Sequence, residues 1–176
     1  MDLPDDARAE LAVWRDEVLA GRTELRLVAP PALHVTLVFL GWMPEKEIGR
    51  ISELTQAAIP AGERPVLAAA GVKLLPPRRP RLFALDLSDT GDRAVAVQRA
   101  ISDALEAGKL YTPEKRPFWP HITLARVKRN AFAPPLEPGG PPPPADPWQA
   151  AAVTLYRSTL LPQGARYDAL ERIELG

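Results

Sequence analysis

Apolar residues recur at intervals of three and four in three segments of the chain, and this spacing is typical of amphipathic helices. It predicts helices over residues 4–20, 44–58 and 92–107. Gly21 and Gly108 directly follow the first and third of these segments and are expected to end them. Three helices of this length leave most of the remaining chain for strands and loops.

Short runs rich in Val, Leu, Ile and Phe, bounded by Pro and Gly, predict strands. The predicted strands cover residues 25–28, 33–40, 66–75, 82–87, 120–127, 151–156 and 166–175. Proline dominates residues 133–147, so we expect an exposed loop there. The order of elements predicts an α+β chain that forms one domain over residues 1–176, in two similar halves.

The two halves share a tetrapeptide, His34-Val-Thr-Leu and His121-Ile-Thr-Leu, and these are the only two histidines of the chain. A chance match of the second tetrapeptide to the first has a probability on the order of one in a thousand. Side chains two apart on a strand share a face. Each strand therefore presents an imidazole beside a hydroxyl, Thr36 in the first and Thr123 in the second, with aliphatic residues on the opposite face.

Two such strands lying close together would bring two histidines and two threonines to one site. A neutral imidazole can accept a proton from a nucleophile, and a protonated imidazole can donate one to a leaving group. Two hydroxyls can hydrogen-bond the oxygens of a phosphate between them. This combination is sufficient for in-line phosphoryl transfer without a metal. Two unrelated structural histidines, or a metal site, are the alternatives, although the chain has no H-x-H or H-E-x-x-H.

Composition narrows the functional classes. The 22 basic residues equal the 22 acidic ones, whereas proteins that bind long nucleic acids usually carry a basic excess. The absence of cysteine excludes disulfides, thiolate metal sites and cysteine nucleophiles. No signal peptide or membrane span is recognisable, so we expect a cytoplasmic protein.

The paired H-x-T motifs resemble those of the 2H phosphoesterase superfamily, and in particular the RNA 2′,3′-cyclic phosphodiesterases, first named 2′-5′ RNA ligases. The resemblance extends over nearly the whole chain. It includes PALHVTLVFLG (31–41), PPRRPRLFAL (76–85), RPFWPHITLARV (116–127) and the C-terminal VTLYRSTLLPQGARYDALERIEL (153–175). It implies two pseudo-symmetric lobes whose antiparallel sheets form a central cleft, with the helices outside.

The resemblance also implies an activity, the hydrolysis of RNA 2′,3′-cyclic phosphate ends to 2′-phosphates, without a cofactor or metal. His34 would be the proton donor and His121 the acceptor, roles that the residues alone do not assign. Thr36 and Thr123 would bind the phosphate. Arg126 matches an arginine of the family pattern H-x-T-L-x-R and could bind phosphate too, but in a regular strand its odd spacing from His121 would direct it away.

Other interpretations stay open. The expected partners are RNA 3′ ends or small nucleotides with a 2′,3′-cyclic phosphate, with no membrane and no obligatory protein partner. The same chemistry in reverse would be ATP-independent 2′-5′ RNA ligation, and a non-catalytic module that binds RNA ends or nucleotides is a third possibility. Three arginines in a turn could meet RNA or simply be solvated, and three aromatic residues could stack a base or pack in the core (Arg78, Arg79 and Arg81; Trp42, Trp119 and Tyr156).

Family members usually begin with a strand of the type R-L-F-V-A-I ahead of the Asp-Leu-Pro that stands here at residues 2–4. This sequence does not contain that strand. Its absence would expose a sheet edge or apolar surface.

Overall fold

The computed structural model describes residues 1–62, 64–136, 139–161 and 164–176. Within them the helices and strands are α1 (Asp5–Val18), β1 (Leu25–Leu27), α2 (Ile48–Ala58), β2 (Val66–Leu75), β3 (Leu82–Asp89), α3 (Arg93–Ala107), β4 (His121–Val127), β5 (Trp148–Gln149), β6 (Ala152–Leu161) and β7 (Gly164–Glu174). Short 3-10 turns lie at Pro30–Ala32, Glu45–Glu47 and Thr90–Asp92. The predicted α+β class is confirmed, and each predicted helix is present with slightly shorter ends.

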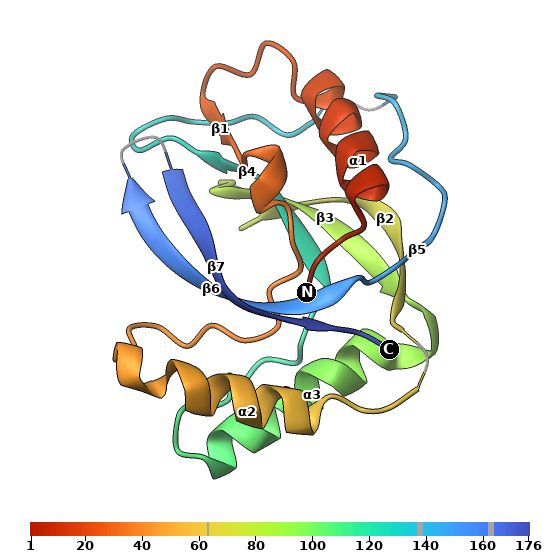
Figure 1. Cartoon of the computed structure of the whole chain (residues 1–176). Helices are drawn as coiled ribbons and strands as arrows, with labels where there is room; N and C mark the ends of the chain where they lie inside the picture. Colours follow the sequence, from red (N-terminus) through yellow and green to blue (C-terminus); the bar gives the residue numbers. More distant parts are fainter. Residues whose placement is uncertain (63, 137–138, 162–163) are drawn as a thin grey trace.

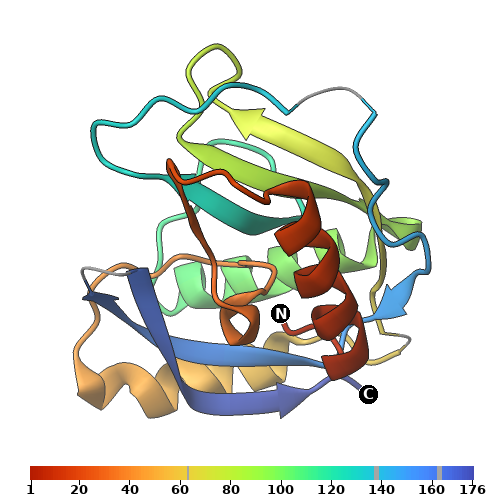
Figure 2. The same cartoon turned by 90° about the horizontal axis from the view of Figure 1, so that it is seen from above.

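The strands form two antiparallel sheets (Figure 1). The larger has the order β1-β4-β3-β2-β5, and the smaller is the β6–β7 hairpin. Isolated bridges connect them, because Asp2 pairs with His34 on one side and Ala152 on the other, while Val35 pairs with Ile122 of β4. The result is one curled antiparallel arrangement whose two sheets are separated in the view from above (Figure 2).

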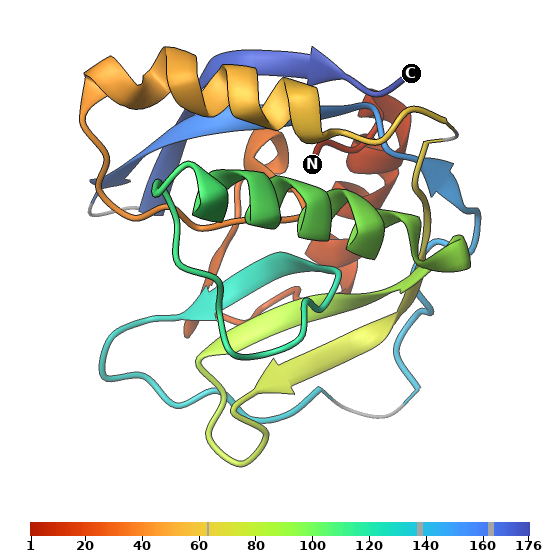
Figure 3. The same ribbon diagram turned by 90° about the horizontal axis from the view of Figure 1, so that it is seen from below.

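The helices cover two sides of this arrangement. Helices α2 and α3 lie side by side below the sheets in Figure 1 and nearest the viewer in Figure 3, whereas α1 lies on the opposite side. Gly108 is the C-cap of α3, as predicted, but with a right-handed φ of −71°. A Cβ atom here would lie 2.7 Å from the Leu54 side chain of α2, so glycine permits the close approach of the two helices.

The core lies against one face of β3 and β4. Phe83 and Leu85 alternate along β3, Ile122 and Leu124 along β4, and all four are fully buried together with Val35. This burial fixes which side chains remain for the opposite face, because alternate residues of a strand point to opposite sides.

The predicted strand over residues 33–40 is wrong in its length. Only His34 and Val35 form β-bridges, and residues 36–40 belong to no strand. Val35 exchanges both of its backbone hydrogen bonds with Met1. No described residue continues this pairing alongside residues 36–40, so the ladder ends there.

Two further differences concern the C-terminal third. The predicted strand over 151–156 extends to Leu161 as β6, and β5 was not predicted. Residues 133–136 and 139–147 form no helix or strand, as expected, although Ala133 is buried and the carbonyls of Pro134 and Pro141 accept hydrogen bonds from Arg22 and Trp14. Pro162-Gln-Gly164 in the sequence predicts a turn that joins the last two strands, but residues 162 and 163 lie outside the described residues.

Residues 1–3 occupy the middle of the curled arrangement. Met1, Asp2 and Leu3 are all buried, and their backbone bonds reach Val35 on one side and Ala151 and Ala152 on the other. Residues 1–3 thus connect the segment of His34 and Val35 to that of Ala151 and Ala152. Within the described part of the chain, no helix is long and apolar enough to span a bilayer.

Candidate active site

The β-bridge between Val35 and Ile122 sets the two H-x-T motifs side by side. In its antiparallel register His34 lies opposite Thr123, and Thr36 lies opposite His121. Val35 and Ile122 are fully buried, so the four polar side chains share the other face. We call this the histidine face. The structure thus brings all four motif residues together, with each histidine facing the threonine of the other motif.

Both histidines are oriented by the same local contact. His34 Nδ1 lies 2.7 Å from the carbonyl oxygen of Ala32, and His121 Nδ1 lies 2.7 Å from that of Trp119, in each case two residues earlier. A carbonyl oxygen only accepts, so Nδ1 must carry the hydrogen in both rings. In the neutral form of either ring, Nε2 is then the nitrogen that can accept a proton.

His34 lies among polar and aromatic groups from distant parts of the chain. Its Nε2 is 3.1 Å from the Thr36 hydroxyl, and its ring meets those of Tyr156 and Tyr167 at centroid distances of 5.7 and 5.0 Å. Burial lowers the pKa of His34 below its usual value, and the Met1 α-amino group lowers it further, while the bond to Ala32 opposes both. The free protein therefore favours neutral His34.

His121 lies flat against an indole ring. The rings of Trp119 and His121 are stacked at a centroid distance of 4.2 Å and an angle of 14°. The Trp119 N–H donates to the Asp86 carboxylate, which forms an ion pair with Lys73 at 2.7 Å. The Lys73 ammonium also lies 5.2 Å from the centroid of the Trp119 ring.

The carboxylate of Asp86 anchors this cluster. Asp86 is also the β3 partner of His121 in the β3–β4 ladder. Burial alone would raise the pKa of Asp86, but the hydrogen bonds from Lys73 and Trp119 outweigh it, so the pKa is lowered. The half-buried Trp119 ring thus lies between the site and β2, in contact with His121 and Lys73.

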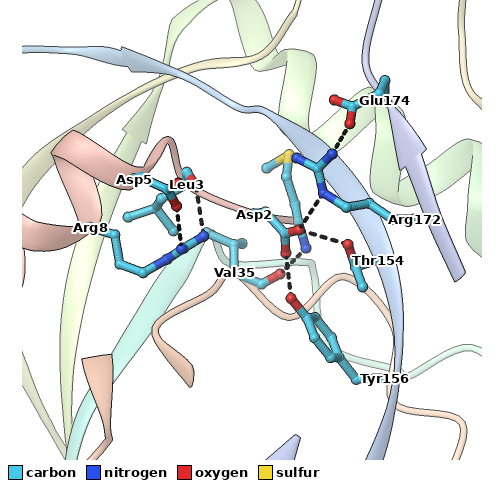
Figure 4. A network of polar contacts seen from close by, with 10 residues as sticks. Asp2, Leu3, Asp5, Arg8, Val35, Thr154, Tyr156, Arg172 and Glu174 are labelled. Atoms are coloured by element: carbon cyan, nitrogen blue, oxygen red, sulfur yellow. Dashed lines mark hydrogen bonds and ion pairs between the residues drawn. The ribbon is translucent and has the colours of Figure 1, made fainter. Parts of the chain in front are cut away.

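A second polar network surrounds Asp2 (Figure 4). Asp2 is a β-bridge partner of His34. Its carboxylate accepts hydrogen bonds from Thr154 (2.6 Å) and Tyr156 (2.9 Å) and is 3.6 Å from Arg172. Burial raises the pKa of Tyr156, and the negative charge of Asp2 adds to this effect. Tyr156 therefore touches His34 while its hydroxyl is held by Asp2. The sequence pattern did not single out Asp2 or Tyr167.

Two hollows lie away from the histidine pair, because neither is lined by His34 or His121. One of about 610 Å³ is lined by Phe39, Leu40 and the end of α3 with residues 109–112. Another of about 380 Å³ is bounded by the Asp2 network, including Tyr156, Arg8 and Arg172. Among the residues described, no three His, Cys, Asp or Glu side chains come together as metal ligands would.

A β-bulge changes the expected direction of Arg126. Phe83 pairs with Ala125 and Ala84 with Thr123, so Leu124 is an extra residue in β4. Leu124 and Ala125 are consecutive buried residues, and the alternation of faces restarts after them. Arg126 consequently points to the same face as His121 and Thr123. The expectation that its spacing directs it away is wrong, because it assumed a regular strand.

The remaining candidates lie at the surface. Arg78, Arg79 and Arg81 are exposed in the turn between β2 and β3, and Arg81 donates to the Ala131 carbonyl at 3.4 Å. Trp42 is 87% exposed, so it does not pack in the core.

A family model of the 2′-5′ RNA ligase superfamily matches residues 3–160. The chain belongs to this superfamily. An RNA 2′,3′-cyclic phosphodiesterase of Thermus thermophilus is 32% identical over 98% of this chain and 86% of its own length. Its counterpart in Escherichia coli K12 is 30% identical over 98% of this chain and 92% of its own length.

Solved structures agree with this assignment. The crystal structure of a Thermus thermophilus protein superposes with a TM-score of 0.80 at 29% identity, covering 98% of this chain and 93% of that one. Escherichia coli LigT complexed with NADP+ gives a TM-score of 0.75 at 25% identity, covering 99% and 94%. The predicted membership of the 2H phosphoesterase superfamily is confirmed.

Proposed function

We propose that this protein hydrolyses RNA 2′,3′-cyclic phosphate ends to 2′-phosphates, using His34 and His121 and no metal. The observation that carries the proposal is the register in which each histidine lies opposite the threonine of the other motif. The names of the relatives above, RNA 2′,3′-cyclic phosphodiesterases, support the same reaction class.

In this mechanism a water oxygen attacks phosphorus on the side opposite the 3′ oxygen. His121 Nε2 accepts the proton of the water as the new P–O bond forms. The bond from phosphorus to the 3′ oxygen breaks, and His34 Nε2 donates a proton to that oxygen. The product carries a 2′-phosphate and a 3′-hydroxyl, and the two histidines have exchanged protonation states, which solvent resets.

The threonines hold the phosphate between the two rings. The Thr36 hydroxyl is directed at His34 Nε2 in the free protein. On substrate binding it would turn to a phosphate oxygen and release Nε2 for proton transfer. Thr36 and Thr123 together would then stabilise the charge that develops on the phosphate oxygens in the transition state.

The lowered pKa of His34 is compatible with the role of donor. A lower pKa makes the imidazolium a stronger acid, and a bound phosphate anion next to the ring would favour its protonated form.

The test is phosphorus NMR of an oligoribonucleotide ending in a 2′,3′-cyclic phosphate, incubated with the protein and a chelator. We expect conversion to a 2′-phosphate, and no conversion by a control protein carrying both His34→Ala and His121→Ala. A 3′-phosphate product, or activity only with added metal, would contradict the proposal. Calorimetric binding of the oligonucleotide without turnover would favour a binding module instead.

The same reaction mixture can also test the reverse reaction, 2′-5′ RNA ligation. Addition of a second RNA with a free 5′-hydroxyl would yield a 2′-5′ linked product if this oxygen can replace water. The resemblance to the 2′-5′ RNA ligase superfamily is the observation that makes this control necessary.

A further inference from the structure

Two arginines face each other across the β1–β4 pair. Arg26 and Arg126 are direct partners in this antiparallel ladder, so their side chains emerge on the same face with Cβ atoms roughly 5 Å apart. Like charges directly opposite each other destabilise a sheet. An arrangement of this kind is stabilised when an anion binds between the two guanidinium groups.

This pair belongs to the histidine face. The bulge at Leu124 directs Arg126 to the side of His121 and Thr123, and Arg26 follows because it is the ladder partner of Arg126. Leu25 and Ala125, on either side of the pair, are buried on the opposite face. By strand rise, Arg126 lies about 10 Å from Thr123 along β4.

Neither arginine side chain has a hydrogen bond or an ion pair within the residues that the structure describes. Other arginines of the surface do pair with carboxylates there, including Arg22 with Glu24, Arg157 with Glu45, Arg166 with Asp168 and Arg172 with Glu174. The chain as a whole has no excess of positive charge. The two arginines, which have no carboxylate partners, therefore concentrate positive charge at this one place on a chain that is neutral overall.

Arg26 also reaches toward the second sheet. A Cβ atom at Gly164, the first residue of β7, would lie 3.6 Å from Arg26 Nε and 3.7 Å from its Cδ. The side chain of Arg26 therefore extends from β1 of the larger sheet to the turn end of the β6–β7 hairpin. A ligand held by Arg26 would lie on the histidine face between the two sheets.

We propose that Arg26 and Arg126 form a subsite for the phosphodiester next to the cyclic phosphate of an RNA chain. This inference rests on the proposed function, because it places the cyclic phosphate at the two histidines. The planar guanidinium groups match the geometry of phosphate oxygens in two parallel hydrogen bonds. The substrate class is then an oligonucleotide, since a mononucleoside cyclic phosphate has no group for this subsite.

The test compares two dinucleotides that end in a 2′,3′-cyclic phosphate. One has an ordinary, negatively charged internal phosphodiester, and the other a neutral methylphosphonate at the same position. For the wild-type protein we expect kcat/KM to be about 10-fold higher, or more, for the charged linkage, as is typical of hydrogen bonds to charged groups. Equal values for the two dinucleotides would overturn the proposal without any variant.

Variants assign the discrimination to this pair. R26Q should bring the ratio of the two kcat/KM values close to 1, and R26K should retain part of it. The matched control is R166Q, which removes one positive charge from the same end of the molecule, where Arg166 is already paired with Asp168. R166Q should keep the wild-type ratio. An unchanged ratio in R26Q, or an equal loss in R166Q, would contradict the subsite.

A binding measurement separates this proposal from the proposed function. Calorimetry with the two dinucleotides carrying a 2′-phosphate end requires no turnover. Tighter binding of the charged form to wild-type protein, lost in R26Q, would support the subsite even if no hydrolysis is found. Hydrolysis with equal binding of both forms would support the activity and reject the subsite.

Discussion

The two histidines carry the same motif but stand in different surroundings. Each Nδ1 is held by the carbonyl two residues earlier, at the same distance of 2.7 Å. Beyond that contact the sites diverge, because His34 meets the rings of two tyrosines while His121 lies flat on Trp119. The local sequence therefore sets the tautomer, and segments from elsewhere in the chain set the environment.

The difference is also electrostatic. Around His34, burial and the Met1 α-amino group favour the neutral ring, although Asp2 partly opposes them. Next to His121, the lowered pKa of Asp86 keeps its carboxylate negative while it holds the Trp119 indole. Two rings in such unlike surroundings are suited to different parts of one proton-transfer cycle.

The largest expected effect separates donor from acceptor. His34→Gln and His121→Gln should each lower kcat about 10²- to 10⁴-fold, the usual contribution of a general acid or base. A substrate with sulfur in place of the bridging 3′ oxygen has a leaving group that needs no protonation. It should restore turnover in the His34 variant but not in the His121 variant, measured by release of the thiol.

The reverse pattern would exchange the two roles. Restoration in both variants, or in neither, would contradict a division of labour between the histidines. Arg99→Gln is a suitable control, since Arg99 is largely exposed on α3 and should leave both rates unchanged.

The alternation of side chains between the two faces of a strand could be predicted from the sequence. The β-bulge that interrupts this alternation in β4 also had a signal in the local sequence. The tetrapeptides predicted which side chains share a face, and Val35 and Ile122 are indeed buried behind them. The bulge in β4 had a visible signal, because Leu124-Ala125 interrupts the alternation of polar and apolar residues in this strand.

Other features had no local signal. The strand predicted over 33–40 ends early because Val35 pairs with Met1, from a distant segment, and no described residue continues that pairing. The contacts of Trp119 with Asp86 and Lys73 join a loop to β3 and β2, and those of Tyr156 and Tyr167 with His34 depend on the β6–β7 hairpin. Such long-range pairs follow from the tertiary fold alone.

A moderate effect is expected from the ring beneath His121. Trp119→Leu removes the stacked ring and should lower kcat by roughly 2- to 10-fold, the worth of an aromatic pair, with KM little changed. Trp119→Phe loses the hydrogen bond to Asp86 but keeps an aromatic ring against His121. Its kcat should therefore fall less than that of Trp119→Leu. Steady-state kinetics with a cyclic mononucleotide would measure both.

The matched control is Trp42→Leu, which removes an exposed indole away from both histidines. It should leave kcat unchanged. If Trp119→Leu raised KM with an unchanged kcat, Trp119 would be a substrate contact and not a residue that positions His121.

The smallest effect concerns stability, and its sign follows from the pKa of His34. Because this pKa is lowered in the folded protein, the unfolded chain takes up a proton first as the pH falls below about 6.5. Wild-type stability should therefore decrease from pH 7 toward pH 5. His34→Gln removes this contribution, so its urea unfolding free energy should depend less on pH over the same range.

The comparison between the two proteins isolates His34 from other titrating groups. The Met1 α-amino group, whose pKa burial lowers to about 6, destabilises both at low pH with the same sign. The difference should be small beside a typical total stability of ~5–15 kcal/mol. The pH dependence of the unfolding free energy of His121→Gln is measured in parallel, for comparison with the His34 variant. A pH dependence of unfolding that stays identical in wild type and the His34 variant would show that the surroundings of His34 do not favour its neutral form.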